Sequence, residues 1–168
     1  MDIGFKEMPR HKTFGKRRSL RLTGFDYRSC HVYHLTWGTV ERKPILTDSN
    51  LTMRLIELLK HTVSKAGICL YAFCFMPDHV HLLVCPEKGL DITRFVQGYK
   101  GRSTRTYWKL GGHGKLWQRG FYDHILRCEE DVKETARYIL GNPVRKGLVE
   151  NLVDYTFSGS CVFEKHDL

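Results

Sequence analysis

The sequence predicts an α+β fold, a ferredoxin-like antiparallel sheet with helices packed on one face. Segments rich in β-branched and aromatic residues alternate with segments of helical periodicity, in the order strand, helix, strand, strand, helix, strand, helix. The 168 residues suit one domain, and 42% hydrophobic residues are enough for an ordinary core. We expect a basic arm over residues 1–28, the folded domain over residues 29–150 and a docking tail over residues 151–168.

The first half of the chain holds three expected strands and one helix. HVYHLTWGTV, at residues 31–40, has the composition of a strand. Apolar residues then recur at helical spacing over residues 50–66, after capping residues at 47–49, and Gly67 ends the helix. Two further strands, at residues 69–75 and 80–85, are joined by a Met-Pro-Asp turn.

The second half continues with a helix, a strand and a helix. A helical pattern covers residues 90–110, although Gly98 and Gly101 weaken the case for one continuous helix. A fourth strand is expected within residues 121–126. Acidic residues at 129–131 suit the first turn of a third helix, which runs to about Leu140. The tail beyond it is expected to dock on the domain and to carry little chemistry.

Charge and cysteine content limit the class of protein. A formal charge of +9 favours a polyanionic partner, above all nucleic acid, although charge alone also fits a ribosome-bound or membrane-surface protein. The six cysteines show no C-x-x-C pair and no regular spacing, which excludes a disulfide framework and a zinc ribbon. No apolar run reaches the ~20 residues that span a bilayer, and the N-terminus lacks the apolar core of a signal peptide. We therefore expect a cytoplasmic protein without a membrane partner.

Two histidines open the third expected strand. His79 and His81 are two residues apart, so their side chains point to the same face, ~6.5–7 Å apart along the strand. Two imidazoles in this arrangement can converge on one divalent cation. A surface or hydrogen-bonded pair is the alternative, but burying two imidazoles between apolar runs is costly unless something satisfies them.

Positive charge and aromatic residues interleave in one stretch. Between Ile92 and Tyr122 there is no carboxylate. Basic groups follow a nucleic-acid backbone by releasing counterions, and aromatic faces stack unpaired bases, at ~1–3 kcal/mol each. The pattern favours single-stranded or hairpin nucleic acid over regular duplex. The nucleic-acid-binding candidates, here and at the two flanking basic segments, are Arg17, Arg18, Arg21, Lys100, Arg102, Arg105, Arg119 and Arg127.

These basic segments also have structural interpretations. The N-terminal arm either lies along phosphates or is a solvated tail. Taken singly, Phe95, Tyr99 and Trp108 are better explained as core residues of the second helix, with the charges on its solvated face. The charge asymmetry is therefore the stronger argument for nucleic acid.

Tyr138 is a candidate nucleophile on the last helix. It lies roughly 145° from the centre of the apolar stripe of that helix, so it is poorly placed to anchor the core. Asn142 is four residues on and would share its side if the helix reached that far, although Pro143 disfavours this. A helical tyrosine alone is usually structural, so the assignment depends on the other motifs.

Several motifs together resemble a known family. Met76-Pro77-Asp78-His79-Val80-His81 is similar to the His-hydrophobic-His motif of HUH-type single-strand transposases. WQRGFYDH, at residues 117–124, and Arg127 resemble a segment of their REP-associated tyrosine transposase branch. Arg137-Tyr138-Ile139 with Asn142-Pro143-Val144 resembles its catalytic helix. RRSLRLTGFDY, at residues 17–27, is similar to one group within that branch, so the resemblance covers nearly the whole chain.

This resemblance implies an HUH endonuclease fold, which is RRM-like, and metal-dependent nicking and rejoining of hairpin DNA from repetitive extragenic palindromes (REP). It implies that His79, His81 and Asn142 hold the metal and that Tyr138 attacks phosphorus, leaving a 5′-phosphotyrosine. Mg²⁺ prefers oxygen ligands and Mn²⁺ accepts nitrogen as well, so either ion is expected. A free phenol ionises near pH ~10, and His124 is a candidate to help remove its proton, unless it is a structural histidine. Relatives act as monomers or as homodimers.

Three other functions remain compatible with the sequence. A domesticated, non-catalytic module would bind single-stranded nucleic acid without cleaving it. A ferredoxin-like RNA-binding domain would use its sheet as a stacking platform, which requires aromatic residues where this chain has histidines. A metal-dependent nuclease would use water as the nucleophile and form no covalent adduct.

Overall fold

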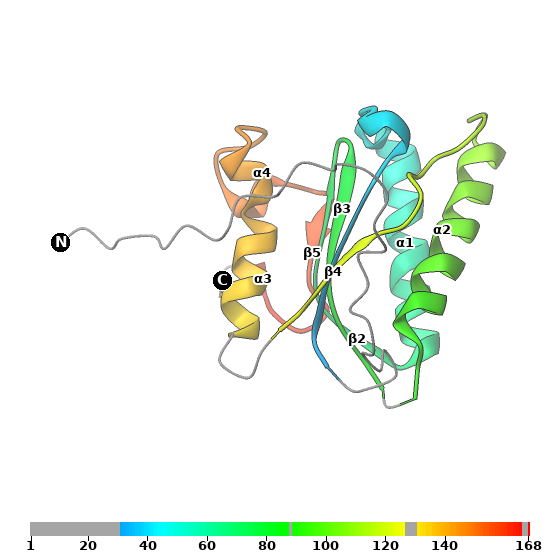
Figure 1. Ribbon diagram of the computed structural model, residues 1–168. Helices are drawn as coiled ribbons and strands as arrows, with labels where there is room; N and C mark the ends of the chain where they lie inside the picture. Colours follow the sequence, from blue (N-terminus) through cyan, green and yellow to red (C-terminus); the bar gives the residue numbers. More distant parts are fainter. Residues whose placement is uncertain (1–30, 88, 127–130, 166–167) are drawn as a thin grey trace.

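A computed structural model describes residues 31–87, 89–126, 131–165 and 168 (Figure 1). The expected N-terminal arm with Arg17, Arg18 and Arg21, and also Arg127, lie outside the described residues. None of the described helices is long and apolar enough to cross a membrane.

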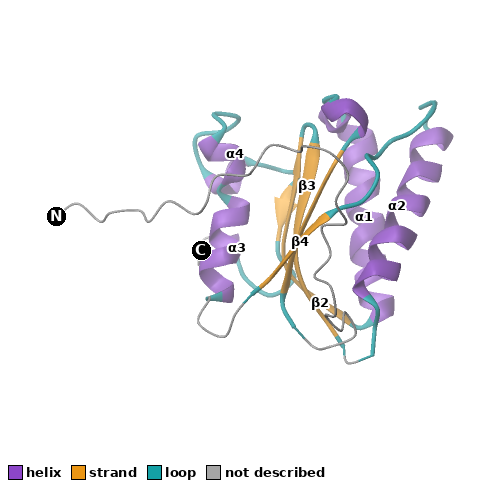
Figure 2. Cartoon of the chain, viewed as in Figure 1, coloured by secondary structure: helices purple, strands orange, loops and turns teal. Residues whose placement is uncertain are grey.

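Five antiparallel strands form one sheet, in the order β4-β1-β3-β2-β5. Figure 2 shows the strands between the helices of the two sides. The strands are β1 (Tyr33–Gly38), β2 (Ile68–Met76), β3 (His79–Pro86), β4 (Tyr122–Ile125) and β5 (Ser158–Gly159). The α-helices are α1 (Ser49–Ala66), α2 (Ile92–Lys109), α3 (Val132–Leu140) and α4 (Asn142–Arg145). Short 3₁₀ turns lie at Val40–Arg42, Ile45–Thr47 and Leu152–Asp154. The predicted α+β class and the order of the expected elements are confirmed.

The helices cover both faces of the sheet, which corrects the expectation that they share one. Helices α1 and α2 lie on one side of the sheet, and α3 and α4 on the other (Figure 1). The physical reason is the central strand β2, which is apolar on both faces. Phe73 and Phe75 belong to the core beneath α1 and α2, whereas Cys74 and Met76 belong to a second apolar cluster beneath α3.

Helix α1 begins and ends where the sequence predicts. The carboxylate of Asp48 accepts a hydrogen bond from the backbone amide of Leu51, which caps the helix. Gly67 closes the helix in the left-handed conformation, with φ 65°. Helix α2 is continuous despite its two glycines, because Phe95 and Tyr99 fasten it to the core and the Tyr99 hydroxyl donates to the carbonyl of Leu55, 2.9 Å away.

Gly67→Ala is expected to lower the free energy of unfolding by ~1–2 kcal/mol, because alanine is strained in the left-handed region. The new Cβ would also lie 2.6 Å from Cδ of Glu87, although that side chain is exposed and can move. Gly101→Ala is the matched control: it lies within α2, nothing is within 4 Å of the added Cβ, and we expect a gain of ~0.5–1 kcal/mol. Urea denaturation measures both, and equal effects would contradict this explanation of Gly67.

The tail docks along the outer edge of β2. Strand β5 pairs with Phe73 and Cys74. The Tyr155 hydroxyl donates to the carbonyl of Phe75 over 2.8 Å, and Lys165 Nζ donates to the carbonyl of Tyr155 over 2.7 Å. The tail thus closes one side of the apolar cluster beneath α3.

Candidate active site

The two histidines of β3 face helix α3. His81 lies opposite Thr36 of β1 and Cys74 of β2, and His79 lies opposite Met76. Cross-strand partners share a face, and Cys74 and Met76 pack beneath α3. The ring centroids of His79 and His81 are 4.8 Å apart, so the predicted shared face is confirmed. His81 is buried, and His79 is half-buried beside it.

Each imidazole is oriented by a hydrogen bond at Nδ1. His79 Nδ1 donates to Oδ1 of Asp78, 2.5 Å away. His81 Nδ1 lies 3.0 Å from the Thr36 hydroxyl and 3.1 Å from Nε2 of His34. Metal-binding histidines usually donate their other ring N–H to such partners, which fixes the tautomer and the ring plane. Coordination of a metal would then fall to Nε2 of each ring.

His34 and Thr36 are functional candidates that the motifs in the sequence did not single out. The sequence of β1 does point to them, because apolar and polar residues alternate along this strand. Tyr33, Leu35 and Trp37 belong to the core beneath α1 and α2. The polar residues between them must point to the opposite face, where His81 lies. The first expected strand therefore supplies the partners of the metal-binding candidate on the third.

The loop after β1 supplies an ion-pair partner for Asp78. Arg42 Nη1 lies 3.6 Å from Oδ2 of Asp78. Gly38 lies opposite His79, and an added Cβ there would stand 3.0 Å from Cδ of Arg42. Glu41 and Arg42 have φ values of 53° and 57°, a conformation that costs non-glycine residues energy and is common near functional sites.

Tyr138 lies at the edge of the apolar cluster on the histidine face. Helix α3 buries Ala136, Ile139 and Leu140, whereas Tyr138 is half-buried. Its ring packs against the cluster that contains Cys74 and Met76, the β2 residues opposite the two histidines. As predicted, Tyr138 lies outside the buried stripe of its helix, on an element that covers the proposed metal ligands.

Asn142 begins helix α4, directly after the turn at Gly141. Pro143 has no amide hydrogen, and Asn142 Nδ2 instead donates to the carbonyl of Ile139 over 3.0 Å. With Nδ2 engaged, Oδ1 is the atom that would act as a ligand. Helix α4 packs against β2.

The donor set fits a divalent ion of the Mn²⁺ or Mg²⁺ type. Across the described ranges of the chain, no three His, Cys, Asp or Glu side chains form a cluster able to hold an ion. A metal bound by His79 and His81 would therefore complete its coordination with oxygen atoms, from an amide, from water or from substrate. Two imidazoles with oxygen ligands suit Mn²⁺, and Mg²⁺ accepts the same site less readily.

His124 lies on the same face, two strands from His81. It is directly opposite His34 on β1, and the ring centroids of His34 and His81 are 5.3 Å apart. His124 is thus the cross-strand neighbour of a histidine whose ring lies beside that of His81. Its role as a proton acceptor stays a prediction.

Residues 27–142 match the family described as Transposase IS200 like. This chain belongs to that family. A Haemophilus influenzae protein named as a REP-associated tyrosine transposase is 32% identical over 145 residues, which are 79% of this chain and 81% of that protein. The REP-associated tyrosine transposase of Escherichia coli K12 is 27% identical over 139 residues, with the same coverage of 79% and 81%.

A solved structure of a REP-associated tyrosine transposase bound to a REP hairpin has the same fold. It matches with a TM-score of 0.62 at 20% identity, over 87% of this chain and 82% of that one. This likeness confirms the predicted fold of REP-associated tyrosine transposases.

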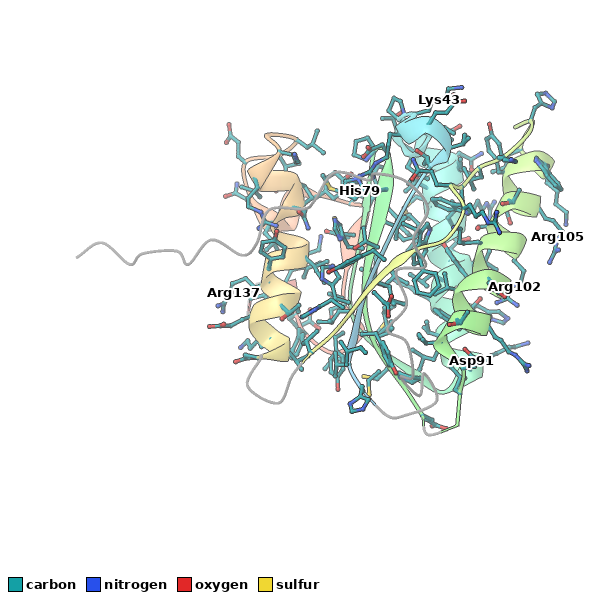
Figure 3. The ribbon with its side chains drawn as sticks, in the orientation of Figure 1. Lys43, His79, Asp91, Arg102, Arg105 and Arg137 are labelled. Carbon is teal, nitrogen blue, oxygen red and sulfur yellow. The ribbon has the colours of Figure 1, made fainter. Side chains whose placement is uncertain are left out.

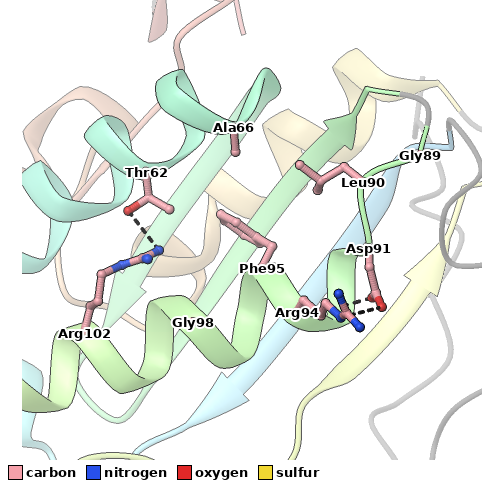
Figure 4. A pocket seen from close by; sticks show the side chains of 9 residues that line it. All are labelled: Thr62, Ala66, Gly89, Leu90, Asp91, Arg94, Phe95, Gly98 and Arg102. Carbon is pink, nitrogen blue, oxygen red and sulfur yellow. Dashed lines mark hydrogen bonds and ion pairs between the residues drawn. The ribbon is translucent and has the colours of Figure 1, made fainter.

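In this IS200-like transposase, the basic residues of α2 lie away from the histidines. Arg102 and Arg105 are exposed on α2, across the sheet from Arg137 of α3 (Figure 3). Arg102 Nη2 lies 3.5 Å from the Thr62 hydroxyl, and both side chains line a groove of about 390 Å³ between α1 and α2 (Figure 4). The structure therefore does not bring Arg102 or Arg105 next to His79 and His81, and any DNA contact there is a second surface.

The aromatic residues of the transposase divide between core and surface. Phe95 and Tyr99 are buried, as expected for core residues of the second helix. Trp117 is also buried, and its Nε1 donates to the Ser103 hydroxyl over 2.7 Å. Trp108 is 52% exposed at the last turn of α2, so its assignment to the core was wrong. The helix extends past the core at that point.

Lys100 fastens the loop before β4 onto α2. Its Nζ donates to the carbonyls of Gln118 and Gly120, each 2.6 Å away. Between these two carbonyls the loop carries Arg119, which is exposed. The backbone amide of Gln118 donates to the carbonyl of Gly38, at the end of β1. Any contribution of Lys100 to DNA binding would therefore act through this loop.

The Lys100→Met variant is expected to remove a pH dependence of stability. Burial lowers the pKa of Lys100 from 10.5 to about 8. Between these values the unfolded chain keeps a proton that the folded chain has lost, so the free energy of unfolding rises with pH there. Allowing for its partial exposure, we expect ~1–2 kcal/mol from this residue. In urea denaturation, the free energy of unfolding of the wild type relative to that of Lys100→Met should be larger at pH 10 than at pH 7.5. The same difference at both pH values would contradict the lowered pKa of Lys100.

Proposed function

We propose that this IS200-like transposase cleaves and rejoins single-stranded or hairpin DNA of the REP type through a covalent 5′-phosphotyrosine on Tyr138. The observation that carries the proposal is the placement of α3. The helix with Tyr138 covers the face of the sheet on which His79 and His81 lie, and it packs against their cross-strand neighbours. The nucleophile and the metal-binding candidates are thus assigned to one side of the sheet.

His79, His81 and Asn142 would hold a divalent ion, Mg²⁺ or Mn²⁺. When bound there, such an ion would polarise a phosphate and offset its negative charge. Asp78 and Thr36 keep the two imidazoles in the orientation that presents Nε2, so the site is built before DNA arrives.

Tyr138 would attack phosphorus through its hydroxyl oxygen. A new oxygen–phosphorus bond forms at the tyrosine while the bond from phosphorus to the 3′ oxygen of the preceding nucleotide breaks, leaving a free 3′ hydroxyl. The phenol proton passes to a base, for which His124 is a candidate, and the departing 3′ oxygen takes up a proton, from that base or from water, to become the hydroxyl. Attack of a 3′ hydroxyl on the phosphotyrosine reverses the step, which rejoins strands without ATP.

The choice of DNA rests on charge and on relatives. The formal charge of +9 favours a polyanionic substrate. Two relatives are named REP-associated tyrosine transposases, and the matched solved structure holds a REP hairpin. Both relatives are bacterial proteins, and a protein that acts on repeats in chromosomal DNA as their names imply would work in the cytoplasm. The RNA-platform alternative loses support, because helices cover both faces of the sheet.

A labelled REP-type hairpin incubated with the protein and Mn²⁺ tests the proposal on a denaturing gel. We expect a DNA band shifted by the mass of the protein, and none with EDTA. Cleavage without such a band would indicate a nuclease that uses water. Hairpin binding without cleavage would indicate a non-catalytic binding protein, and either result would refute the proposed function.

A further inference from the structure

Arg145 makes two contacts with Tyr138. Its guanidinium carbon lies 4.0 Å from the centroid of the Tyr138 ring, which is a cation–π arrangement. Its Nη2 also donates to the backbone carbonyl of Tyr138 over 2.6 Å. One side chain therefore holds both the ring and the backbone of the proposed nucleophile.

Gly141 provides the room for this contact. Its φ of −76° is ordinary, so the backbone there does not require glycine. An added Cβ would instead stand 2.9 Å from Nη1 of Arg145 and 3.2 Å from the carbonyl oxygen of Arg137. The turn between α3 and α4 is thus shaped so that Arg145 can fold back over Tyr138.

Arg145 also lies on the side of the sheet that carries the histidines. Its helix α4 packs against β2, on the side of the sheet opposite α1 and α2 (Figure 1). Cys74 is directly opposite His81 in the β2–β3 pairing. Arg145 therefore belongs to a helix that lies on the same side of the sheet as His79 and His81.

We propose that Arg145 is a positioning residue, which fixes the ring of Tyr138 for in-line attack on the scissile phosphate. The proposal rests on the proposed function, because it assigns Tyr138 the attack. A half-buried tyrosine near the end of a helix has more than one rotamer open to it. If Arg145 already holds the ring in place, less of the activation free energy is needed to orient it. Arginine suits this task better than lysine, because its planar group stacks on the ring while still donating to the carbonyl.

Three variants separate the effect of the contact with Tyr138 from the effect of positive charge: Arg145→Ala, Arg145→Lys and Lys146→Ala. Lys146 is the adjacent exposed cation at the end of α4, so its loss removes the same charge without touching Tyr138. The rate of covalent adduct formation is measured in a single turnover at saturating hairpin, together with hairpin affinity and Tm.

We expect Arg145→Ala to slow the adduct by ~10-fold or more at unchanged hairpin affinity, Arg145→Lys to recover part of the rate, and Lys146→Ala to stay within ~2-fold of wild type. Added methylguanidine should restore part of the Arg145→Ala rate. An Arg145→Ala variant that forms the adduct at the wild-type rate, or that loses rate only through affinity, would overturn the proposal.

A second readout does not depend on activity. In protein labelled with fluorotyrosine, the ¹⁹F resonance of residue 138 should move in Arg145→Ala and stay in place in Lys146→Ala. An unmoved resonance in Arg145→Ala would overturn the contact itself. If the wild type forms no adduct but the resonance moves in Arg145→Ala, the contact between Arg145 and Tyr138 is real and the proposed function is wrong. The positioning role of Arg145 in the attack is then overturned together with the proposed function.

Discussion

Tyr138→Phe is expected to abolish the covalent protein–DNA adduct while leaving the fold and hairpin binding intact. The substitution removes one oxygen atom, the proposed nucleophile, so adduct formation should fall by at least ~10³-fold. The ring itself remains, and with it the packing against the cluster beneath α3 and the contact with Arg145. Hairpin affinity should therefore stay within ~2-fold, measured by fluorescence anisotropy.

Tyr122→Phe is the matched control for this experiment. Tyr122 is exposed on β4 and lies opposite Thr36, which in turn lies opposite His81. It is therefore a second phenol on the histidine face, in the cross-strand row that contains His81. The control should form the adduct at close to the wild-type rate. An adduct that survives in Tyr138→Phe and disappears in Tyr122→Phe would reassign the nucleophile to β4.

Replacement of either histidine by alanine is expected to abolish metal-dependent cleavage. Each substitution removes an imidazole ligand, and the remaining donors bind a divalent ion too weakly to retain it. Mn²⁺ binding, followed by electron paramagnetic resonance, should be lost together with the adduct. The exposed His113, in the loop after α2, provides the control, and His113→Ala should bind Mn²⁺ and cleave normally.

The two histidine variants should differ in stability. His81 is 4% exposed and bonded to Thr36 and His34, so His81→Ala should lower the free energy of unfolding by ~1–3 kcal/mol. His79→Ala should cost less, because His79 is half-buried and its partner Asp78 is reachable by water. Mn²⁺ binding retained in either variant would show that the ion lies elsewhere.

Local patterns in the sequence were sufficient for most of the fold. Gly67 and the apolar spacing before it place the end of α1, and the two-residue period of β3 places His79 and His81 on one face. The run ICLYAFCFM of β2 is almost continuously apolar, which is typical of a strand buried on both faces. That run contained the signal for a helix on each side of the sheet, which the expectation of a one-sided arrangement did not use.

Other features depend on tertiary contacts that no local pattern encodes. Lys100 is one of several lysines and arginines in a basic stretch, and only the folded loop shows that its ammonium group binds two carbonyls. Arg145 likewise appears as one of two adjacent basic residues shortly after Pro143. Its contact with Tyr138 exists because α3 stops and α4 starts across Gly141, and that turn is a property of the packed chain.

The most direct test of a shared site for the metal and the phenol is a distance measurement without catalysis. Mn²⁺ is added to fluorotyrosine-labelled protein, and broadening of each ¹⁹F resonance by the ion is recorded. We expect the resonance of Tyr138 to broaden strongly, and that of Tyr99, in the core on the other side of the sheet, to broaden far less. Bound Mn²⁺ that depends on His79 and His81 but leaves the Tyr138 resonance sharp, with and without hairpin, would contradict the shared site.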